Sequence, residues 1–493
     1  CIRDRVSFDE RGLPVGELAQ AWGISADGTI YSFVWKSGVK WHDGSPLTSE
    51  DIAFTIDLLR NGGEIVPADL QEFWKGIDVV TLDELNLQFK LPEPFSPFLD
   101  YLTFGILPKH ILDGKTIAEI KDDNFNLQPV GSGPYQFEQL ISEDNQIIGV
   151  VLTTFEDYYG KQPFIEQIIF RYYPDEAAAI EAYRNDQVQG ISNVSDNVLA
   201  EALAEPDLSV YTGRLPQMSL ILFNLKDESA RFLQDKDIRL ALYKAINRQY
   251  ILDKILGGQA ILADGVIFPG TWAYYDDTPR VEYDLEEALA LLKEAGYTLP
   301  AEGGMIRKNE DGVEFSFKLI YPDSEQHRAI AEAIQNNWRA LDIQVELEAV
   351  PYDRLVAERL DSRNFQAALV DLNLTQSPDP DPYPFWDQVQ ATGGQNYTQW
   401  DNRIASEYLE TARITLDVSE RARLYRNFQV LFSDELPALP LYYPVYSYAV
   451  DEQVQCVSMG PLFDPSDRFA TVLDWYLVAR VPTAPPSTAT QTP

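Results

Sequence analysis

Hydrophobic positions along the chain follow two periods, and segments of the two kinds alternate. Aromatic residues recur at every second position over residues 29–35, which predicts a strand that buries Tyr31, Phe33 and Trp35 on one face. A helix is predicted to begin after Thr48, because an acidic residue three positions later completes a capping box. The pattern therefore opens with a strand followed by a capped amphipathic helix.

The alternation continues in the second half of the chain, from Met218 onward. The apolar run at 219–224 predicts a buried strand, and residues 235–255 predict one helix. Asp284 predicts the start of another helix, with Glu287 three residues later. Beyond it come strand positions Phe315, Phe317 and Leu319, helix positions Ile330, Ile334, Trp338 and Leu341, and strand positions Ile343, Val345 and Leu347. This spacing is typical of βαβ units and predicts a mixed α/β fold.

The length of the chain adds a division into lobes. Single hydrophobic cores stop growing at about 250–300 residues, and this chain has 493. Two α/β lobes joined near residues 218–224 are the simplest division of the chain. Residues 481–493, rich in proline and threonine, are expected to form a flexible tail.

Charge and composition exclude several functions. Asp and Glu total 77 against 39 Lys and Arg, a net charge of −38, and such a surface repels phosphate backbones, so no nucleic-acid partner is expected. Two cysteines and three histidines, all far apart in sequence, predict no metal site. No nucleophile elbow or phosphate-binding loop occurs. We therefore expect no catalytic residue, no metal and no cofactor.

Five segments carry motifs whose order and spacing are informative. They are LAQAWGISADGTIYSFVWKSGVKWHDGSPLTSEDIAFTIDLL at 18–59, VGSGPY at 130–135, IRLALYKAINRQYILDKILGG at 238–258, DPDPYPFW at 379–386 and NYTQWDN at 396–402. Together they resemble the extracellular solute-binding proteins of peptide and nickel ABC importers, family 5. The resemblance covers roughly Val6 to Leu477.

This resemblance implies both a fold and a function. The implied fold is α/β and two-lobed, like a periplasmic binding protein of type II in its large three-subdomain form, with a hinge between the lobes. The resemblance implies lobe I at 1–220 with an inserted subdomain at about 30–160, lobe II at 221–440, a return to lobe I at 441–480, and the tail at 481–493. Together with the strand-like segments at 219–223 and 440–444, it implies that the chain crosses between the lobes near Met218–Asn224 and near Pro437–Pro444. The implied protein captures a peptide or related small solute between the lobes and delivers it to an ABC transporter permease in the membrane. It binds without turnover, and we expect it to act as a monomer.

The segment from Asp379 to Trp386 is the leading candidate for the solute site. Alternating prolines predict an extended, stiff backbone that loses little entropy on binding. In the family, an Asp in this region pairs with the ligand's positive group, notably a peptide's α-ammonium, and by position Asp379 or Asp381 would carry that role. We expect one of the two to face the cleft and neither to belong to the core. The alternative is a solvent-exposed loop without ligand contacts.

Aromatic side chains supply candidate walls for the same pocket. These candidates are Tyr383, Phe385, Trp386, Trp272, Tyr274 and Tyr275. The chain has 59 aromatic residues, so most of them must belong to the core or the surface. Asn224, near the expected lobe junction, is a candidate hydrogen-bonding partner of the ligand backbone, with the capping of a strand end as the alternative.

A second hypothesis makes the protein a carboxylate-dependent, glycosidase-like hydrolase that acts on an oligosaccharide. The carboxylates of such a pair lie about 5–5.5 or 6.5–9.5 Å apart across one bond. The polyproline geometry expected for Asp379 and Asp381 points them in different directions, so binding without catalysis is favoured. The solute stays open among a peptide, an oligosaccharide and a metallophore. Nickel is the least favoured, because no histidine lies near 379–386.

The first residue, Cys1, allows two interpretations. One is a bacterial lipoprotein with an acylated cysteine. The other is the edge of a fragment, which is favoured because the portion that usually precedes the first family motif, including a sheet strand, is missing. The resemblance implies an extracytoplasmic location, in the periplasm or at the outer face of the cell membrane. We expect Cys1 and Cys456 to be unpaired.

Overall fold

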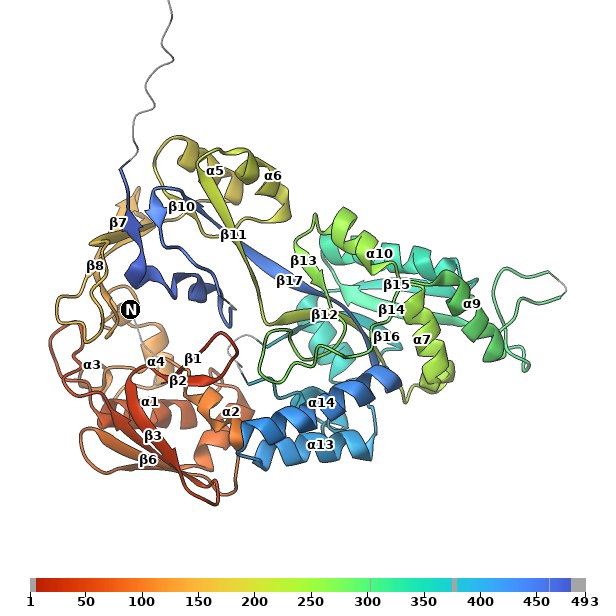
Figure 1. Cartoon of the computed structure of the whole chain (residues 1–493), viewed down its shortest axis with the longest axis horizontal. Helices are drawn as coiled ribbons and strands as arrows, with labels where there is room; N and C mark the ends of the chain where they lie inside the picture. Colours follow the sequence, from red (N-terminus) through yellow and green to blue (C-terminus); the bar gives the residue numbers. More distant parts are fainter. Residues whose placement is uncertain (1–5, 302, 375–378, 461, 480–493) are drawn as a thin grey trace, which may run out of the picture.

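The computed structural model describes residues 6–301, 303–374, 379–460 and 462–479. Within these residues the strands form one large sheet, two smaller sheets and two short two-stranded pairs. Figure 1 shows helices around the large sheet at one end of the molecule and the smaller sheets grouped at the other. Cys1 and the predicted tail at 481–493 lie outside the described residues.

An N-terminal subdomain is built on an antiparallel sheet with the strand order β3–β4–β6–β5. Its elements are β3 (Ala19–Ile24), β4 (Ile30–Trp35), β5 (Asp78–Thr81), β6 (Asn86–Lys90), α1 (Ser49–Arg60), α2 (Ala68–Lys75), α3 (Lys109–Leu112) and α4 (Ile117–Lys121). Tyr31, Phe33 and Trp35 are each at most 2% exposed, which confirms the predicted buried face. Thr48 and Asp51 form the predicted capping box at the start of α1.

The other small elements lie toward the chain ends and between residues 135 and 214. They are β1 (Val6–Phe8), β2 (Pro14–Gly16), β7 (Tyr135–Glu143), β8 (Gln146–Thr154), β9 (Gln167–Arg171), α5 (Glu176–Arg184), β10 (Gly190–Ile191), α6 (Asp196–Ala204), β11 (Leu208–Arg214), β18 (Val454–Gln455) and β19 (Tyr476–Leu477). β7, β8 and β9 form an antiparallel sheet of their own, and β1 pairs with β2. β10 and β11 belong to the large sheet, and Figure 1 shows β7, β8, α5 and α6 at the same end of the molecule as β10.

The large sheet has the order β10–β17–β12–β16–β14–β15, with β11 and β13 also paired to β17. Its remaining strands are β12 (Gln217–Phe223), β13 (Ala260–Leu262), β14 (Ser316–Pro322), β15 (Gln344–Val350), β16 (Ala367–Asn373) and β17 (Ala438–Asp451). β14 and β15 are parallel and are connected by α10 (Glu325–Arg339), which confirms the predicted βαβ unit.

β12 is buried on both faces, as its continuous apolar run predicts. Besides α10, the helices of this half include α7 (Lys236–Lys244), α9 (Leu285–Glu294), α11 (Tyr352–Arg354), α13 (Arg403–Ile414) and α14 (Val418–Glu435). Ile221 and Phe223 pack in a core shared with α7, α9 and α10, whereas Leu220 and Leu222 face the core of α13 and α14. The strand therefore sits between two helical layers.

The long strand β17 connects the two halves of the molecule (Figure 1). Up to Pro444 it pairs with β12 and β13, and from Val445 onward it pairs with β11. The other crossing lies at 215–216, between β11 and β12, because the residues from Gln217 onward already pair with β16. Two adjacent segments thus carry the chain between the halves.

The prediction of one continuous helix over residues 235–255 is wrong. α7 ends at Lys244, and Asn247 then begins α8 (Arg248–Tyr250), which continues into a π-helical turn at Ile251–Ile255. The Asn247 side chain accepts a hydrogen bond from the Tyr250 backbone N–H (2.9 Å). Asparagine is among the strongest N-cap residues, so it favours a new start over continuation.

None of the helices among the described residues combines the length and apolar character that a bilayer crossing requires.

Candidate functional site

The segment from Asp379 to Trp386 lies where the half with α13 and α14 meets the N-terminal subdomain. The Asp379 backbone N–H donates to the carboxylate of Asp100 in the 3₁₀ helix at Ser96–Leu102. In the same region the Ser96 hydroxyl donates to the Thr415 carbonyl (2.5 Å). The predicted solute loop is therefore held between two subdomains.

Asp379 forms a two-pronged ion pair with Arg421 of α14. Arg421 donates from Nη1 to Oδ2 (2.7 Å) and from Nη2 to Oδ1 (2.8 Å), and the two side chains are 5% and 8% exposed. Arg421 also donates to the Tyr425 hydroxyl (3.1 Å) and lies over the Trp272 ring. Burial lowers the pKa of Arg421, but the Asp379 carboxylate outweighs it, so the pKa lies above its usual range.

Asp381 forms a similar pair with a second arginine. Arg413 of α13 donates from Nε to Asp381 Oδ2 (2.8 Å), and its guanidinium lies 4.0 Å from the centre of the Tyr383 ring and 5.0 Å from that of Phe95. The Tyr383 backbone N–H donates to the other carboxylate oxygen (3.1 Å). Burial raises the pKa of Asp381, and Arg413 offsets this in part.

Asp100 adds a third carboxylate to the two ion pairs. Burial raises its pKa well above the usual range, and the neighbouring charge of Asp379 raises it further. The two guanidinium groups balance only two carboxylates, so a proton retained on Asp100 leaves the group neutral overall. We refer to Asp100, Asp379, Asp381, Arg413 and Arg421 as the carboxylate–arginine cluster.

The cluster corrects two expectations. Asp379 and Asp381 are buried and paired rather than placed outside the core, because helices α13 and α14 bring arginines against them. The backbone is not extended throughout, because Tyr383–Trp386 forms a helical turn, α12, with proline in its first positions. The fixed φ of proline suits a first helical turn as well as an extended chain.

The predicted aromatic walls divide into buried and half-buried residues. Trp386 is 2% exposed and packs edge-on against Phe432, and Trp272 is 7% exposed beside Arg421. Both belong to the core of this half. Tyr383 and Tyr274 are half-buried and keep surface that a solute can contact. Phe385 and Tyr275 are also half-buried.

Asn224 lies at the end of β12 that is remote from the crossing at 215–216. Its Nδ2 donates to the Arg363 carbonyl (2.9 Å). Its Oδ1 accepts from the Lys226 backbone N–H (3.1 Å) and from Gln399 Nε2 (2.6 Å). These contacts match the capping of a strand end and correct the expected position at the lobe junction.

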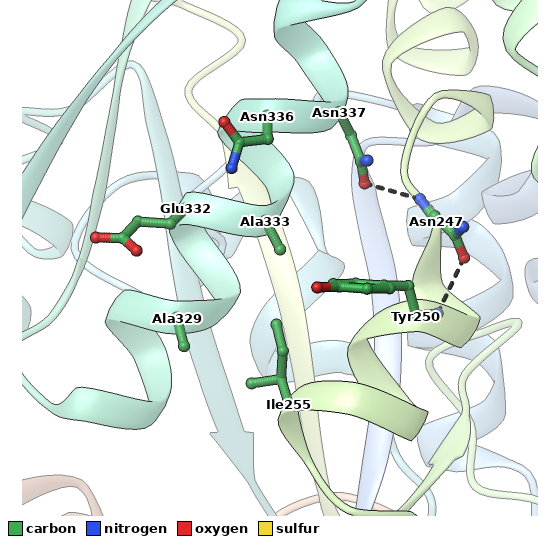
Figure 2. Close-up of a pocket in the computed structure, with 8 residues that line it drawn as sticks. All are labelled: Asn247, Tyr250, Ile255, Ala329, Glu332, Ala333, Asn336 and Asn337. Carbon is green, nitrogen blue, oxygen red and sulfur yellow. Dashed lines mark hydrogen bonds between the residues drawn. The ribbon is translucent and has the colours of Figure 1, made fainter.

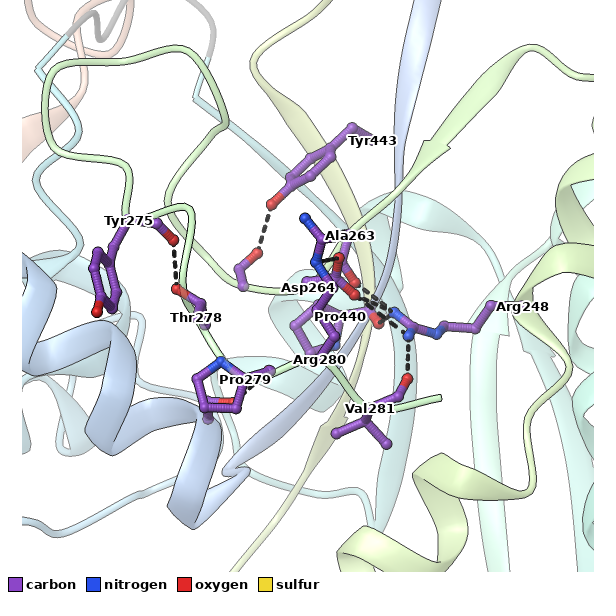
Figure 3. Close-up of polar contacts among 12 residues, drawn as sticks. Arg248, Ala263, Asp264, Tyr275, Thr278, Pro279, Arg280, Val281, Pro440 and Tyr443 are labelled. Carbon is purple, nitrogen blue, oxygen red and sulfur yellow. Dashed lines mark hydrogen bonds and ion pairs between the residues drawn. The ribbon is translucent and has the colours of Figure 1, made fainter. Parts of the chain in front are cut away.

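A loop over residues 263–281 carries Trp272 and Tyr274 and is fixed by buried polar contacts (Figure 3). Arg248 donates to the Ala263 and Val281 carbonyls (2.5 Å each), and the Tyr443 hydroxyl donates to the Gly265 carbonyl (2.7 Å). Asp264 lies 3.5 Å from Arg248 and 3.4 Å from Arg280.

The same loop reaches the N-terminal residues. The Trp272 backbone N–H donates to the Arg11 carbonyl (2.9 Å) in the turn between β1 and β2. Because both ends of the loop are anchored by Arg248, its tip is held in place where the two halves meet.

A separate cavity of about 420 Å³ lies between α8, the π-helical turn and α10. Figure 2 shows the Tyr250 ring extending across it toward Ala333, with Asn247 bonded to Asn337 at one side. It shares no residue with the carboxylate–arginine cluster or with the loop at 263–281. Its volume is in the range of small-molecule sites, but the sequence did not point to it.

Metal ligation has no support in the described ranges. Among the residues of 6–301, 303–374, 379–460 and 462–479, no three His, Cys, Asp or Glu side chains come together as a metal site would require. Cys456, the cysteine within these ranges, is exposed and unpaired, as expected.

Sequence reasoning missed Arg413, Arg421 and Asp100. A signal for Arg421 exists, because Arg421, Leu424, Tyr425 and Phe428 recur at helical spacing and share the buried face of α14. An arginine on such a face needs buried acceptors for its donors, and a carboxylate is one such acceptor. No comparable signal connects Asp100 to Asp379 across 279 positions.

Comparison with known proteins places this arrangement in a family. Residues 14–396 match the model of bacterial extracellular solute-binding proteins, family 5. The chain belongs to this family. It is a solute-binding protein that serves an ABC transporter and is not an enzyme.

Particular relatives cover most of the chain. It is 26% identical to the dipeptide-binding protein of Escherichia coli K12 over 468 residues, 90% of this chain and 84% of that protein. It is 27% identical to the oligopeptide-binding protein AppA of Bacillus subtilis over 457 residues, 91% and 81% of the two chains. The structure of that AppA with a nonapeptide has a TM-score of 0.72 at 25% identity and covers 97% and 93%. The two-lobed type II fold expected from the sequence is confirmed.

Proposed function

We propose that this protein captures a peptide between its two lobes and delivers it to the permease of an ABC transporter. The observation that carries the proposal is the match to the dipeptide- and oligopeptide-binding relatives over more than four fifths of their lengths. Two adjacent crossings, at 215–216 and within β17, support a hinge that lets the lobes close around the solute.

We propose the lobe division given above, with lobe I at 1–220 and 441–480 and lobe II at 221–440. The pairing change within β17 at Pro444–Val445 supports the return crossing. An extracytoplasmic location and a monomeric state belong to the same proposal, and the periplasmic relatives of similar fold support the location.

A peptide is favoured over the other solutes considered. The nickel-binding relative NikZ from Campylobacter jejuni, solved with Ni(L-His), is 22% identical and supports the fold alone. The described residues gather no set of metal ligands, so nickel would have to arrive with its own chelator. For an oligosaccharide as the solute, the support is limited to the exposed aromatic surface of Tyr383 and Tyr274.

We propose that Tyr383 and Tyr274 contact the solute, whereas Asp379 and Asp381 hold the wall of the site in place. An ammonium group reaches Asp379 only by sharing its carboxylate with Arg421, which already takes both oxygens. Trp272 and Trp386 support this wall from the core. Asn224 caps its strand.

Native mass spectrometry tests the function directly. The protein is incubated with a defined pool of di- to pentapeptides and, separately, with oligosaccharides and nickel–histidine. We expect one-to-one complexes with peptides whose masses stay unchanged on recovery. Binding of an oligosaccharide or of nickel–histidine, with no peptide retained, would overturn the proposal, and shortened peptides would revive the hydrolase.

A further inference from the structure

Arg214, near the crossing between the lobes, has no carboxylate partner among the described residues. Arg214 is the last residue of β11, directly before the crossing at 215–216. It is half-buried, and one of its N–H groups donates to the carbonyl of Pro269 in the loop at 263–281. No carboxylate within the described part of the chain forms an ion pair with it.

Other arginines without a carboxylate partner make more contacts within the fold. Arg239 gives hydrogen bonds to the backbone carbonyls of Leu233, Glu435 and Leu436, and Arg363 gives hydrogen bonds to five backbone carbonyls. Arg468 gives one hydrogen bond to the Pro465 carbonyl and is packed against three aromatic rings. Arg214 has five N–H donors, and one of them donates to an acceptor within the described residues.

The groups that face Arg214 are neutral. Its guanidinium lies 5.9 Å from the centre of the Tyr443 ring, and Tyr274 is its other electrostatic neighbour. Burial raises the pKa of both tyrosines, so each keeps its proton at neutral pH. The nearby carboxylate of Asp264 already faces Arg248 and Arg280 (Figure 3).

The cost of this arrangement is visible in Arg214 itself. Burial lowers its pKa, and only the two tyrosines act in the opposite direction. A half-buried cation without a counter-charge is stabilised by any anion that reaches it. A guanidinium takes a carboxylate in two-pronged geometry, as Arg421 does with Asp379.

We propose that Arg214 binds a carboxylate group of the solute. This inference rests on the proposed function and adds the chemistry of one end of the ligand. Arg214 comes from β11 of one lobe and contacts a loop of the other, so it lies in the region between the lobes where we propose that the solute is held. In a chain of net charge −38, a local cation is needed to hold an anionic group against the general repulsion.

The experiment uses three sets of tripeptides of matched sequence, without acidic residues, in native mass spectrometry. The first set has a free C-terminal carboxylate, the second a C-terminal amide, and the third an amide together with one glutamate side chain. We expect the wild type to favour the free acid over the amide by about ten- to hundredfold. Recovery of binding in the third set would identify a side-chain carboxylate as the source.

Variants then connect this preference to Arg214. In Arg214→Met the ratio of free acid to amide should fall to within about twofold, and Arg214→Lys should give an intermediate ratio, because it keeps the charge and loses the fork. Arg171→Met is the matched control, since Arg171 is an exposed arginine of β9 and its loss changes the net charge equally.

The possible outcomes distinguish a failure of the Arg214 inference from a failure of the proposed peptide-binding function. Peptides bound with no preference for the free acid, or a preference that survives in Arg214→Met, would overturn the inference alone. An equal loss of acid and amide in that variant would also overturn it and would make Arg214 a positioning residue of the hinge. Failure of all three sets to bind the wild type would remove the proposed function and the inference together.

Discussion

Arg421 and Arg214 are both at least partly buried from solvent, but only Arg421 has a carboxylate beside it. Arg421 gives both ends of its guanidinium to Asp379 and one more hydrogen bond to Tyr425. Arg214 gives one hydrogen bond to a backbone carbonyl and faces only neutral tyrosines. Burial opposes the charge of both, but the protein compensates it within the fold only for Arg421.

This difference separates two uses of a buried charge. A guanidinium with its own carboxylate joins parts of the fold, and removing either partner leaves a charge without compensation. A guanidinium without its own carboxylate can still take the carboxylate of a ligand as its counter-charge, as a binding group does. We therefore expect the loss of Arg421 to lower mainly the stability of the protein, and the loss of Arg214 to lower mainly its affinity for the solute.

The largest effect is expected for Arg421→Met. Removing this guanidinium leaves Asp379 buried without a partner, which costs about 3–5 kcal/mol of unfolding free energy. Denaturation by urea, followed by tryptophan fluorescence, measures the loss. The double variant Arg421→Met with Asp379→Leu should recover most of it. If Arg421→Met alone unfolds at the wild-type urea concentration, the pair does not hold the fold together.

The same pair shows what sequence reasoning could and could not reach. Regular elements followed from local patterns, because the face of β4, the capping box at Thr48 and the βαβ unit at β14–α10–β15 depend on residues close in sequence. The family motifs supplied the two-lobed fold. The break at Asn247 was missed, because its capping depends on a side-chain contact that helical periodicity does not register.

The candidate site was predicted less well, because its contacts join distant segments. Position in the sequence singled out Asp379, but its burial follows from Arg421, 42 residues later, and from Asp100, 279 residues earlier. Arg214 was not singled out either. Its significance depends on an absent partner within the described residues, and only a three-dimensional arrangement shows which carboxylates are near.

Asp100→Asn tests how the carboxylate–arginine cluster makes the stability of the protein depend on pH. The pKa of Asp100 is raised in the folded state, so its contribution to stability is present below the unfolded value of about 4 and is lost as pH rises toward the folded value. The asparagine variant keeps an acceptor for the Asp379 N–H and cannot ionise. Urea midpoints measured from pH 4 to pH 9 should therefore fall less with rising pH than those of the wild type. Parallel profiles would show that Asp100 does not carry this dependence.

Asn224→Ala probes a residue whose polar groups are all used within the fold. The change leaves the Arg363 carbonyl and the Lys226 N–H without a partner and should cost about 1–3 kcal/mol of unfolding free energy. Affinity for any peptide identified by native mass spectrometry should stay within about twofold, because Asn224 lies away from the crossing. A selective loss of affinity with unchanged stability would return Asn224 to the solute site.

The smallest effect on stability is expected for Arg214→Met, although it removes the same functional group as Arg421→Met. Only one hydrogen bond is lost, no carboxylate is left unpaired, and the cost of shielding a charge disappears, so the unfolding free energy should change by less than about 1 kcal/mol. The same urea titration measures it beside the Arg421 variant. A loss as large as that of Arg421→Met would mean that Arg214 holds the crossing between the lobes, and its vacant donors would then belong to the fold rather than to the solute.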